Sequence, residues 1–162
     1  MKKLILLAII ILSFAVRAGD IENARKYYKN KDFEQAKKYY LKAAQNGDER
    51  GYNGLGAIYM EEDNFDEAEQ MFLKAGEYGY NGLGGVYMIR KEYDKAQEMY
   101  YKALNTALYY STNPSPIYYN LGVLYYFKQD YDNAKKFIKK AADTGVNKEA
   151  EKIYKQMIQL GY

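Results

Sequence analysis

The sequence contains no cysteine, no histidine and no tryptophan, and it has only two prolines. Without cysteine no disulfide can form, so the hydrophobic core alone must hold the fold. Without histidine and cysteine the chain lacks the commonest general base, the thiol nucleophile and the usual zinc and iron ligands. We therefore expect no metal, no cofactor and no enzymatic activity. An enzyme acting on cell-wall or polysaccharide material is a disfavoured alternative, because no convergent pair of acids stands out.

The first 18 residues have the features of a secretory signal peptide. A positive start at Lys2 and Lys3 is followed by an uncharged, largely apolar run over residues 4–16, and residues 16–18 place small side chains at the usual cleavage spacing. The run is shorter than the ~20 residues that a transmembrane helix needs. We expect cleavage after Ala18 and export to the periplasm or the medium. An uncleaved N-terminal anchor is the alternative.

Removal of this segment changes the charge balance. The whole chain has a net charge of +3, but Lys2, Lys3 and Arg17 all lie in the leader, so the remainder has 24 − 3 = 21 basic residues against 21 acidic residues. Nucleic-acid binders draw sequence-independent affinity from a basic surface. We therefore expect no nucleic-acid partner, and no membrane association after cleavage.

A stretch of ten residues recurs 28 positions along the chain. Residues Gly51–Met60 return as Gly79–Met88 with eight identities out of ten. Self-similarity at a period of 20 to 50 residues is typical of repeat proteins, in which small units stack to bury a shared core. The 21 tyrosines suit such thin layers, because a tyrosine ring fills space between helices while its hydroxyl reaches water.

A second element follows each copy of the first. It begins with a polar residue and an aromatic residue and continues as an amphipathic helix with apolar residues at i, i+4 and i+7. The four stripes are Ala36, Tyr40 and Ala43; Ala68, Phe72 and Ala75; Ala96, Tyr100 and Ala103; and Ala134, Ile138 and Ala141. The sequence therefore alternates two kinds of helix.

Together the two elements resemble the tetratricopeptide repeat, which has an aromatic, leucine-glycine, tyrosine, alanine and an aromatic at this spacing. The matching residues are Tyr52, Leu55, Gly56, Tyr59, Ala68 and Phe72; Tyr80, Leu83, Gly84, Tyr87, Ala96 and Tyr100; and Tyr118, Leu121, Gly122, Tyr125, Ala134 and Ile138. The paired alanines before Gly47 and Gly145 are similar to Sel-like repeats. The resemblance implies an all-α, right-handed α-solenoid of about four helix-turn-helix repeats.

The expected domain covers residues 19–162 and follows the leader at 1–18. Its repeats are expected at about 19–47, 48–76, 77–114 and 115–146, with a capping helix at 147–160. The short interval between the second and third repeats predicts a shortened second helix or a tight joint around Gly76 and Gly79.

Glycines are frequent in the first helices of the repeats. Gly56, Gly84 and Gly122 are expected where the two helices of one repeat cross. Two explanations stay open for the additional glycines, Gly54, Gly82 and Gly85. They form either the smooth floor of a groove or a relief of crowding caused by the 28-residue step.

The acidic residues around Asp63 resemble a calcium loop only superficially, because the glycine and the closing glutamate are missing. Helix capping is the preferred interpretation. Asp32 with Gln35, and Asn64 with Glu67, have the spacing of a capping box.

The resemblance implies that ligand contacts come from the inner face of the first helices. The residues chosen on that face are Asn53, Met60, Asn81, Met88, Tyr119 and Tyr126. This face is nearly uncharged, whereas the well-known carboxylate-clamp members use basic residues there. We therefore expect a non-catalytic adaptor that binds a peptide or protein segment in a concave groove. The alternative is a structural component of a cell-envelope assembly that uses its outer face.

Overall fold

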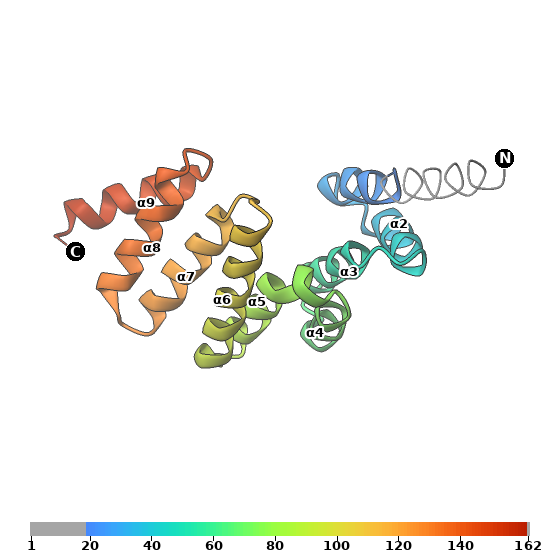
Figure 1. The fold of residues 1–162 in the computed structure, drawn as a ribbon, viewed down its shortest axis with the longest axis horizontal. Helices are drawn as coiled ribbons and strands as arrows, with labels where there is room; N and C mark the ends of the chain where they lie inside the picture. The colour runs from blue at the N-terminus through green and yellow to red at the C-terminus, as the bar shows by residue number, and fades with distance from the viewer. Residues whose placement is uncertain (1–18, 162) are drawn as a thin grey trace. The chain divides into compact units, whose positions relative to one another are not determined.

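A computed structural model of the chain describes residues 19–161, so the expected signal peptide lies outside the described residues. Within residues 19–161 the chain forms helices joined by short turns, with no strand, which confirms the all-α prediction (Figure 1). The chain divides into two compact units between Gly82 and Leu83.

The first unit contains two helical hairpins and a short 3₁₀ segment. Residues 19–29 are helical and pack against α2 (Phe33–Gln45) in the core. Helix α3 (Arg50–Glu61) pairs with α4 (Phe65–Lys74). Helix α4 has only 10 residues, and η1 (Gly76–Gly79) leads directly from it into α5 (Tyr80–Ile89). The short α4 and the tight η1 joint together produce the 28-residue step in the sequence.

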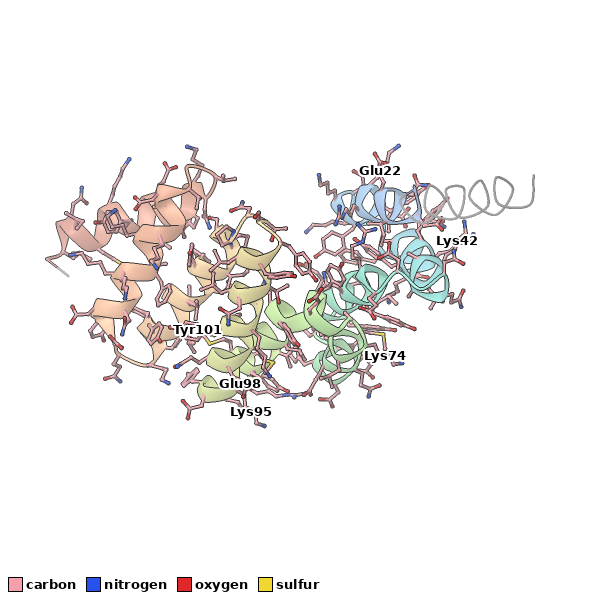
Figure 2. All side chains as sticks on the ribbon, viewed as in Figure 1. Glu22, Lys42, Lys74, Lys95, Glu98 and Tyr101 are labelled. Carbon is pink, nitrogen blue, oxygen red and sulfur yellow. The ribbon has the colours of Figure 1, made fainter. Side chains whose placement is uncertain are left out.

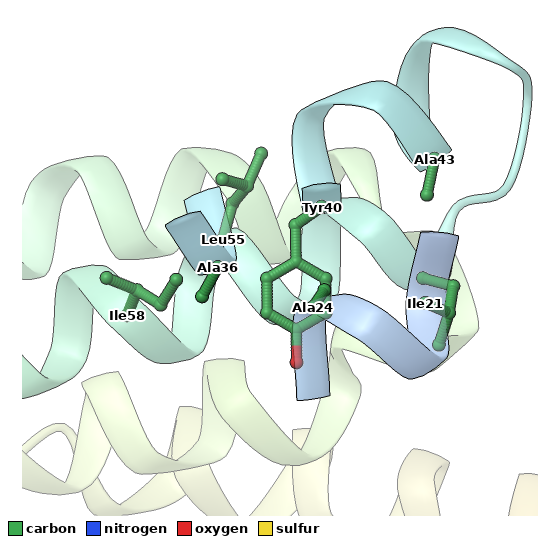
Figure 3. Packing of buried hydrophobic residues seen from close by; sticks show 7 residues of the cluster. All are labelled: Ile21, Ala24, Ala36, Tyr40, Ala43, Leu55 and Ile58. Atoms are coloured by element: carbon green, nitrogen blue, oxygen red, sulfur yellow. The ribbon is translucent and has the colours of Figure 1, made fainter. Parts of the chain in front are cut away.

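The core of the first unit lies between the helix at residues 19–29 and helices α2 and α3. It contains Ile21, Ala24, Ala36, Tyr40, Ala43, Leu55 and Ile58 (Figure 3). Small alanines alternate with large side chains, so the helices approach closely and still fill the space between them. An ion pair lies at the edge of this core, where Lys42 Nζ is 2.9 Å from the buried carboxylate of Asp20 (Lys42 is labelled in Figure 2).

The second unit continues from α5 with four more helices. They are α6 (Tyr93–Tyr109), α7 (Ser115–Phe127), α8 (Tyr131–Asp143) and α9 (Lys148–Gln159). Helix α8 packs against both α7 and α9. The buried hydroxyl of Ser115 donates to the carbonyl of Ala141 at 3.1 Å, which joins the start of α7 to the end of α8.

Each turn within a repeat has the same backbone conformation. Lys31, Asp63, Lys91 and Gln129 have φ between 59° and 62°, the left-handed region. The amide of the next residue donates to a tyrosine carbonyl of the preceding helix, as from Asp130 to Tyr125 at 2.9 Å. This bond is typical of an α-helix that ends with one residue in the left-handed conformation. The four turns therefore share one backbone geometry, although none of them has glycine at the left-handed position.

Side-chain caps begin several of the second helices, but not all of those expected. The carboxylate of Asp32 accepts from the amide of Gln35, and Asp130 and Asn147 cap α8 and α9 in the same way. The prediction for Asn64 is wrong, because Asn64 precedes α4 without a side-chain hydrogen bond to it. There the first turn carries Asp66 and Glu67, which suit the positive end of the helix dipole.

Two further findings concern the described residues only. Between residues 19 and 161, no helix combines the length and the apolar character needed to cross a bilayer. Over the same range, no group of three or more acidic side chains is arranged to hold a metal ion.

Candidate functional site

The small residues of the first helices lie where the sequence predicts a helix crossing. A β-carbon at Gly56 would lie 2.6 Å from the ring of Phe72, and one at Gly122 would lie 2.6 Å from Ile138 Cδ1. A β-carbon at Gly84 would overlap the ring of Tyr100. These separations are shorter than van der Waals contact, so in the second, third and fourth repeats only glycine lets the two helices approach this closely.

Two of the additional glycines also face rings and not an open groove. A β-carbon at Gly54 would overlap the ring of Tyr40, and one at Gly82 would overlap the ring of Phe72. In both cases the ring belongs to the second helix of the preceding repeat. The structure therefore favours the crowding explanation for Gly54 and Gly82, and it corrects the idea that they form a groove floor.

Three of the six residues chosen for a peptide groove belong to the first unit. Asn53 and Met60 are both half-buried and lie seven residues apart on α3, so they share one side of that helix. Asn81 is half-buried in the first turn of α5. All three side chains are uncharged and partly open to solvent.

The other three residues belong to the second unit. Met88 is half-buried near the end of α5, and Tyr119 is half-buried on α7. Tyr126 is seven residues after Tyr119, on the same side of α7, and is 56% exposed. Its ring makes an edge contact with Tyr131 at 5.7 Å between centroids. Tyr119 and Tyr126 therefore lie on the same side of α7, and both are accessible to solvent.

Tyr126 opens onto a hollow that the sequence did not reveal. This hollow has a volume of about 340 Å³ and lies among α7, α8 and α9. Its lining residues are Gly122, Val123, Tyr126, Tyr131, Ala134, Ile138, Ile153, Gln156, Met157 and Leu160. Only Tyr126 belongs to the predicted set. The available sequence signal was the aliphatic Ile138 at a position that is aromatic in the first three repeats.

The side of α7 facing α6 is held by a network of aromatic residues. The hydroxyls of Tyr101 and Tyr125 lie 3.0 Å apart, and the rings of Tyr125 and Phe137 stack with centroids 5.5 Å apart (Tyr101 is labelled in Figure 2). Burial, together with the hydrogen bond to Tyr125, raises the pKa of Tyr101 to about 12. Tyr101 therefore stays protonated at neutral pH and acts as a packing and hydrogen-bonding group.

Phe127 does not lie with Tyr126 in the hollow. It is 54% exposed and stacks on Tyr93 of α6, with ring centroids 6.3 Å apart. These two consecutive residues of α7 thus contact different neighbours, and of the two only Tyr126 lines the hollow.

Comparison with known families gives two matches. One model of the tetratricopeptide repeat matches residues 78–145, and a second matches residues 49–77. A comparison with curated proteins gives no match.

Solved structures share the fold at low sequence identity. The structure of PilF from Pseudomonas aeruginosa is 22% identical, with a TM-score of 0.69, over 80% of this chain and 61% of that one. BtubC from P. vanneervenii is 21% identical, with a TM-score of 0.62, over 77% of this chain and 61% of that one. The chain thus spans less than two thirds of either relative. These likenesses establish the helical-repeat fold and carry no statement about partners.

Proposed function

Since residues 49–145 belong to the tetratricopeptide repeat family, whose members generally mediate protein–protein interactions, we propose that this chain is an exported, non-catalytic adaptor. It binds a peptide or protein segment through the inner face of its first helices. After removal of its leader it binds neither nucleic acid nor a membrane. A structural role in a cell-envelope assembly, with the outer face in contact, is the second candidate.

The observation that carries this proposal is the side of α7 formed by Tyr119 and Tyr126. Both side chains are reachable from solvent, and both combine a rigid ring with a polar tip. Truncation of such aromatic anchors at the centre of an interface often costs ~2 kcal/mol or more. Asn53, Met60, Asn81 and Met88 supply uncharged, adaptable surface on α3 and α5.

Titration calorimetry with a partner recovered from the exported proteins tests the binding face. Tyr119→Ala and Tyr126→Ala should each weaken binding about tenfold while leaving the helical circular dichroism unchanged. Tyr109→Ala is the matched control, because Tyr109 is 81% exposed at the end of α6 and outside the proposed face. Affinity should change little between low and moderate salt, because the chain without its leader has no net charge. Unchanged affinity in both variants would favour the assembly role.

N-terminal sequencing of the exported protein tests the localisation separately. The leader geometry predicts a mature chain that begins at Gly19. An intact Met1 on a membrane-bound form would contradict export with cleavage and support the anchor.

A further inference from the structure

The buried carboxylate of Asp20 has one oxygen without a partner. Asp20 lies in the first turn of the helix at residues 19–29 and is 4% exposed. Its Oδ1 accepts a hydrogen bond from Lys42 Nζ at 2.9 Å, whereas its Oδ2 is buried and accepts none. Among residues 19–161 no other buried side-chain oxygen or nitrogen lacks a partner. A buried carboxylate oxygen without a donor is strongly unfavourable, so this position calls for a further donor.

The surrounding core holds Asp20 in place. Ile21 and Ala24 of the same helix are buried, and they belong to one cluster with Ala36 and Ala43 of α2 (Figure 3). Asp20 precedes Ile21 directly, so its carboxylate cannot move into water unless the helix separates from α2. The orphan oxygen is therefore a fixed feature of the first repeat.

Lys42 does not satisfy both oxygens. Its side chain is 55% exposed, and its ammonium group contacts Oδ1 alone. The acidic Glu22, which is exposed on the same helix, carries no donor (Glu22 and Lys42 are labelled in Figure 2). The second donor must therefore come from another group close to Asp20.

Cleavage of the leader creates such a group on the neighbouring residue. In the precursor the nitrogen of Gly19 is an amide with one hydrogen. Hydrolysis adds water across the Ala18–Gly19 bond. The carbonyl carbon of Ala18 takes the hydroxyl and becomes a carboxylate, and the nitrogen takes the remaining hydrogen and the proton that the new acid releases. At neutral pH the product is mainly an α-ammonium group, since the ordinary pKa of an α-amino group is about 8.

The position of Gly19 suits contact with this carboxylate. A β-carbon built at Gly19 would meet nothing within 4 Å, so the space around the residue is open. Glycine rotates freely, and pairing between neighbouring residues closes only a short loop of chain. An α-ammonium at a helix N-terminus is also repelled by the positive end of the helix dipole. A carboxylate in the first turn offsets that repulsion.

We propose that Oδ2 of Asp20 is the site that receives the α-ammonium group of Gly19 after the leader is removed. The proposal rests on the export and cleavage proposed above, and it specifies what cleavage does to the fold. Lys42 and the α-ammonium group would each pair with one oxygen of the same carboxylate. The first helix of the mature chain would thus be fastened to α2 by a contact that the precursor cannot make.

The test compares two mature chains released in vitro by a protease that cuts directly before the chosen N-terminus. One chain begins at Gly19, and the other carries an added Gly-Ser dipeptide before Gly19, which moves the α-ammonium group away from Asp20. The dipeptide should lower the melting temperature by at least about 3 °C. In Asp20→Asn the same dipeptide should change it by less than about 1 °C, because the charged acceptor is gone. Glu22→Gln is the matched control and should keep the full effect of the dipeptide.

Labelling of the α-amino group reads out the pairing directly. Pairing with a carboxylate keeps the amine protonated and unreactive towards an amine-reactive ester at neutral pH. Mass spectrometry of the N-terminal peptide should show labelling of Gly19 at least about fivefold faster in Asp20→Asn than in wild type. Lys42→Gln removes the other ion pair of the same helix and keeps the carboxylate, so its labelling should stay slow.

The outcomes separate the pairing from the cleavage. Equal effects of the dipeptide in wild type and Asp20→Asn would overturn the pairing. Labelling as fast in Lys42→Gln as in Asp20→Asn would also overturn it, because fraying of the helix would then explain both. An unchanged melting temperature with equal labelling in all chains would assign Oδ2 to a water molecule and contradict the proposal. Because both chains are released in vitro, these results do not depend on the signal-peptide cleavage, which N-terminal sequencing of the exported protein tests by itself.

Discussion

Gly79 lies directly against the backbone of Phe72, so that a β-carbon at position 79 would overlap the Phe72 carbonyl oxygen. This contact joins η1 to α4 and is part of the 28-residue step between the second and third repeats. Backbone atoms cannot move aside as a flexible side chain can. The joint therefore depends on glycine at this position.

Gly79→Ala should lower the free energy of unfolding by ~1–3 kcal/mol, since the added methyl group overpacks a rigid contact. Denaturant midpoints with an unchanged slope measure the loss. Gln70→Ala, at an exposed position of α4, is the control. Wild-type stability in Gly79→Ala would contradict the tight joint.

Gly56→Ala should also destabilise the protein despite alanine's higher helix propensity. The methyl group meets the Phe72 ring, and overpacking of ~1–3 kcal/mol exceeds the ~1 kcal/mol gained in propensity. Gly84→Ala should behave alike against Tyr100. In a double-mutant cycle, Phe72→Leu should relieve part of the Gly56→Ala loss. A higher denaturant midpoint for both Gly56→Ala and Gly84→Ala would contradict the assignment of these glycines to helix crossings.

Asn147 and Asn64 offer a matched test of helix capping. The Asn147 side chain accepts from the Ala150 amide at 2.9 Å, whereas Asn64 makes no such bond to α4. Asn147→Ala should therefore cost ~1 kcal/mol of stability, and Asn64→Ala clearly less. Thermal unfolding of both variants compares them directly. Equal losses would show that the side-chain bond to Ala150 does not stabilise α9.

Gln129 occupies the left-handed turn between α7 and α8, with φ of 62°. Glycine adopts this conformation without the steric penalty of a β-carbon, so Gln129→Gly should stabilise the protein by up to ~1 kcal/mol. Lys136→Gly, within α8, should destabilise it by ~1 kcal/mol. Opposite signs in chemical denaturation confirm that the turn, and not glycine itself, decides the effect.

The Tyr101–Tyr125 pair predicts a loss of stability at high pH. The pKa of Tyr101 in the folded protein is about 12, against an ordinary value of 10.0, so folding favours the protonated hydroxyl. This contribution is complete below pH 10 and is lost as the pH rises towards 12. Tyr101→Phe should reduce that dependence and cost ~1 kcal/mol at neutral pH. Unfolding measured from pH 8 to 12 checks both, with Tyr109→Phe as control.

The sequence by itself determined the repeat architecture. Helix type, the crossing glycines and the tight joint around Gly76 and Gly79 follow from patterns within about 35 residues, because helical periodicity and close packing inside a hairpin are local. The near identity of Gly51–Met60 and Gly79–Met88 makes the repeat visible without any structure. Periodicity also placed Tyr126 on the accessible side of α7.

Tertiary structure decided what each periodic position faces. Gly54 and Gly82 follow the helical pattern equally well beside a groove or beside a ring, and only the packed neighbours Tyr40 and Phe72 distinguish the two. The hollow near Ile138 is lined by residues of α7, α8 and α9 together, so no single helix reveals it. The sequence therefore specified the repeats, and the fit between successive helices specified where a space remains.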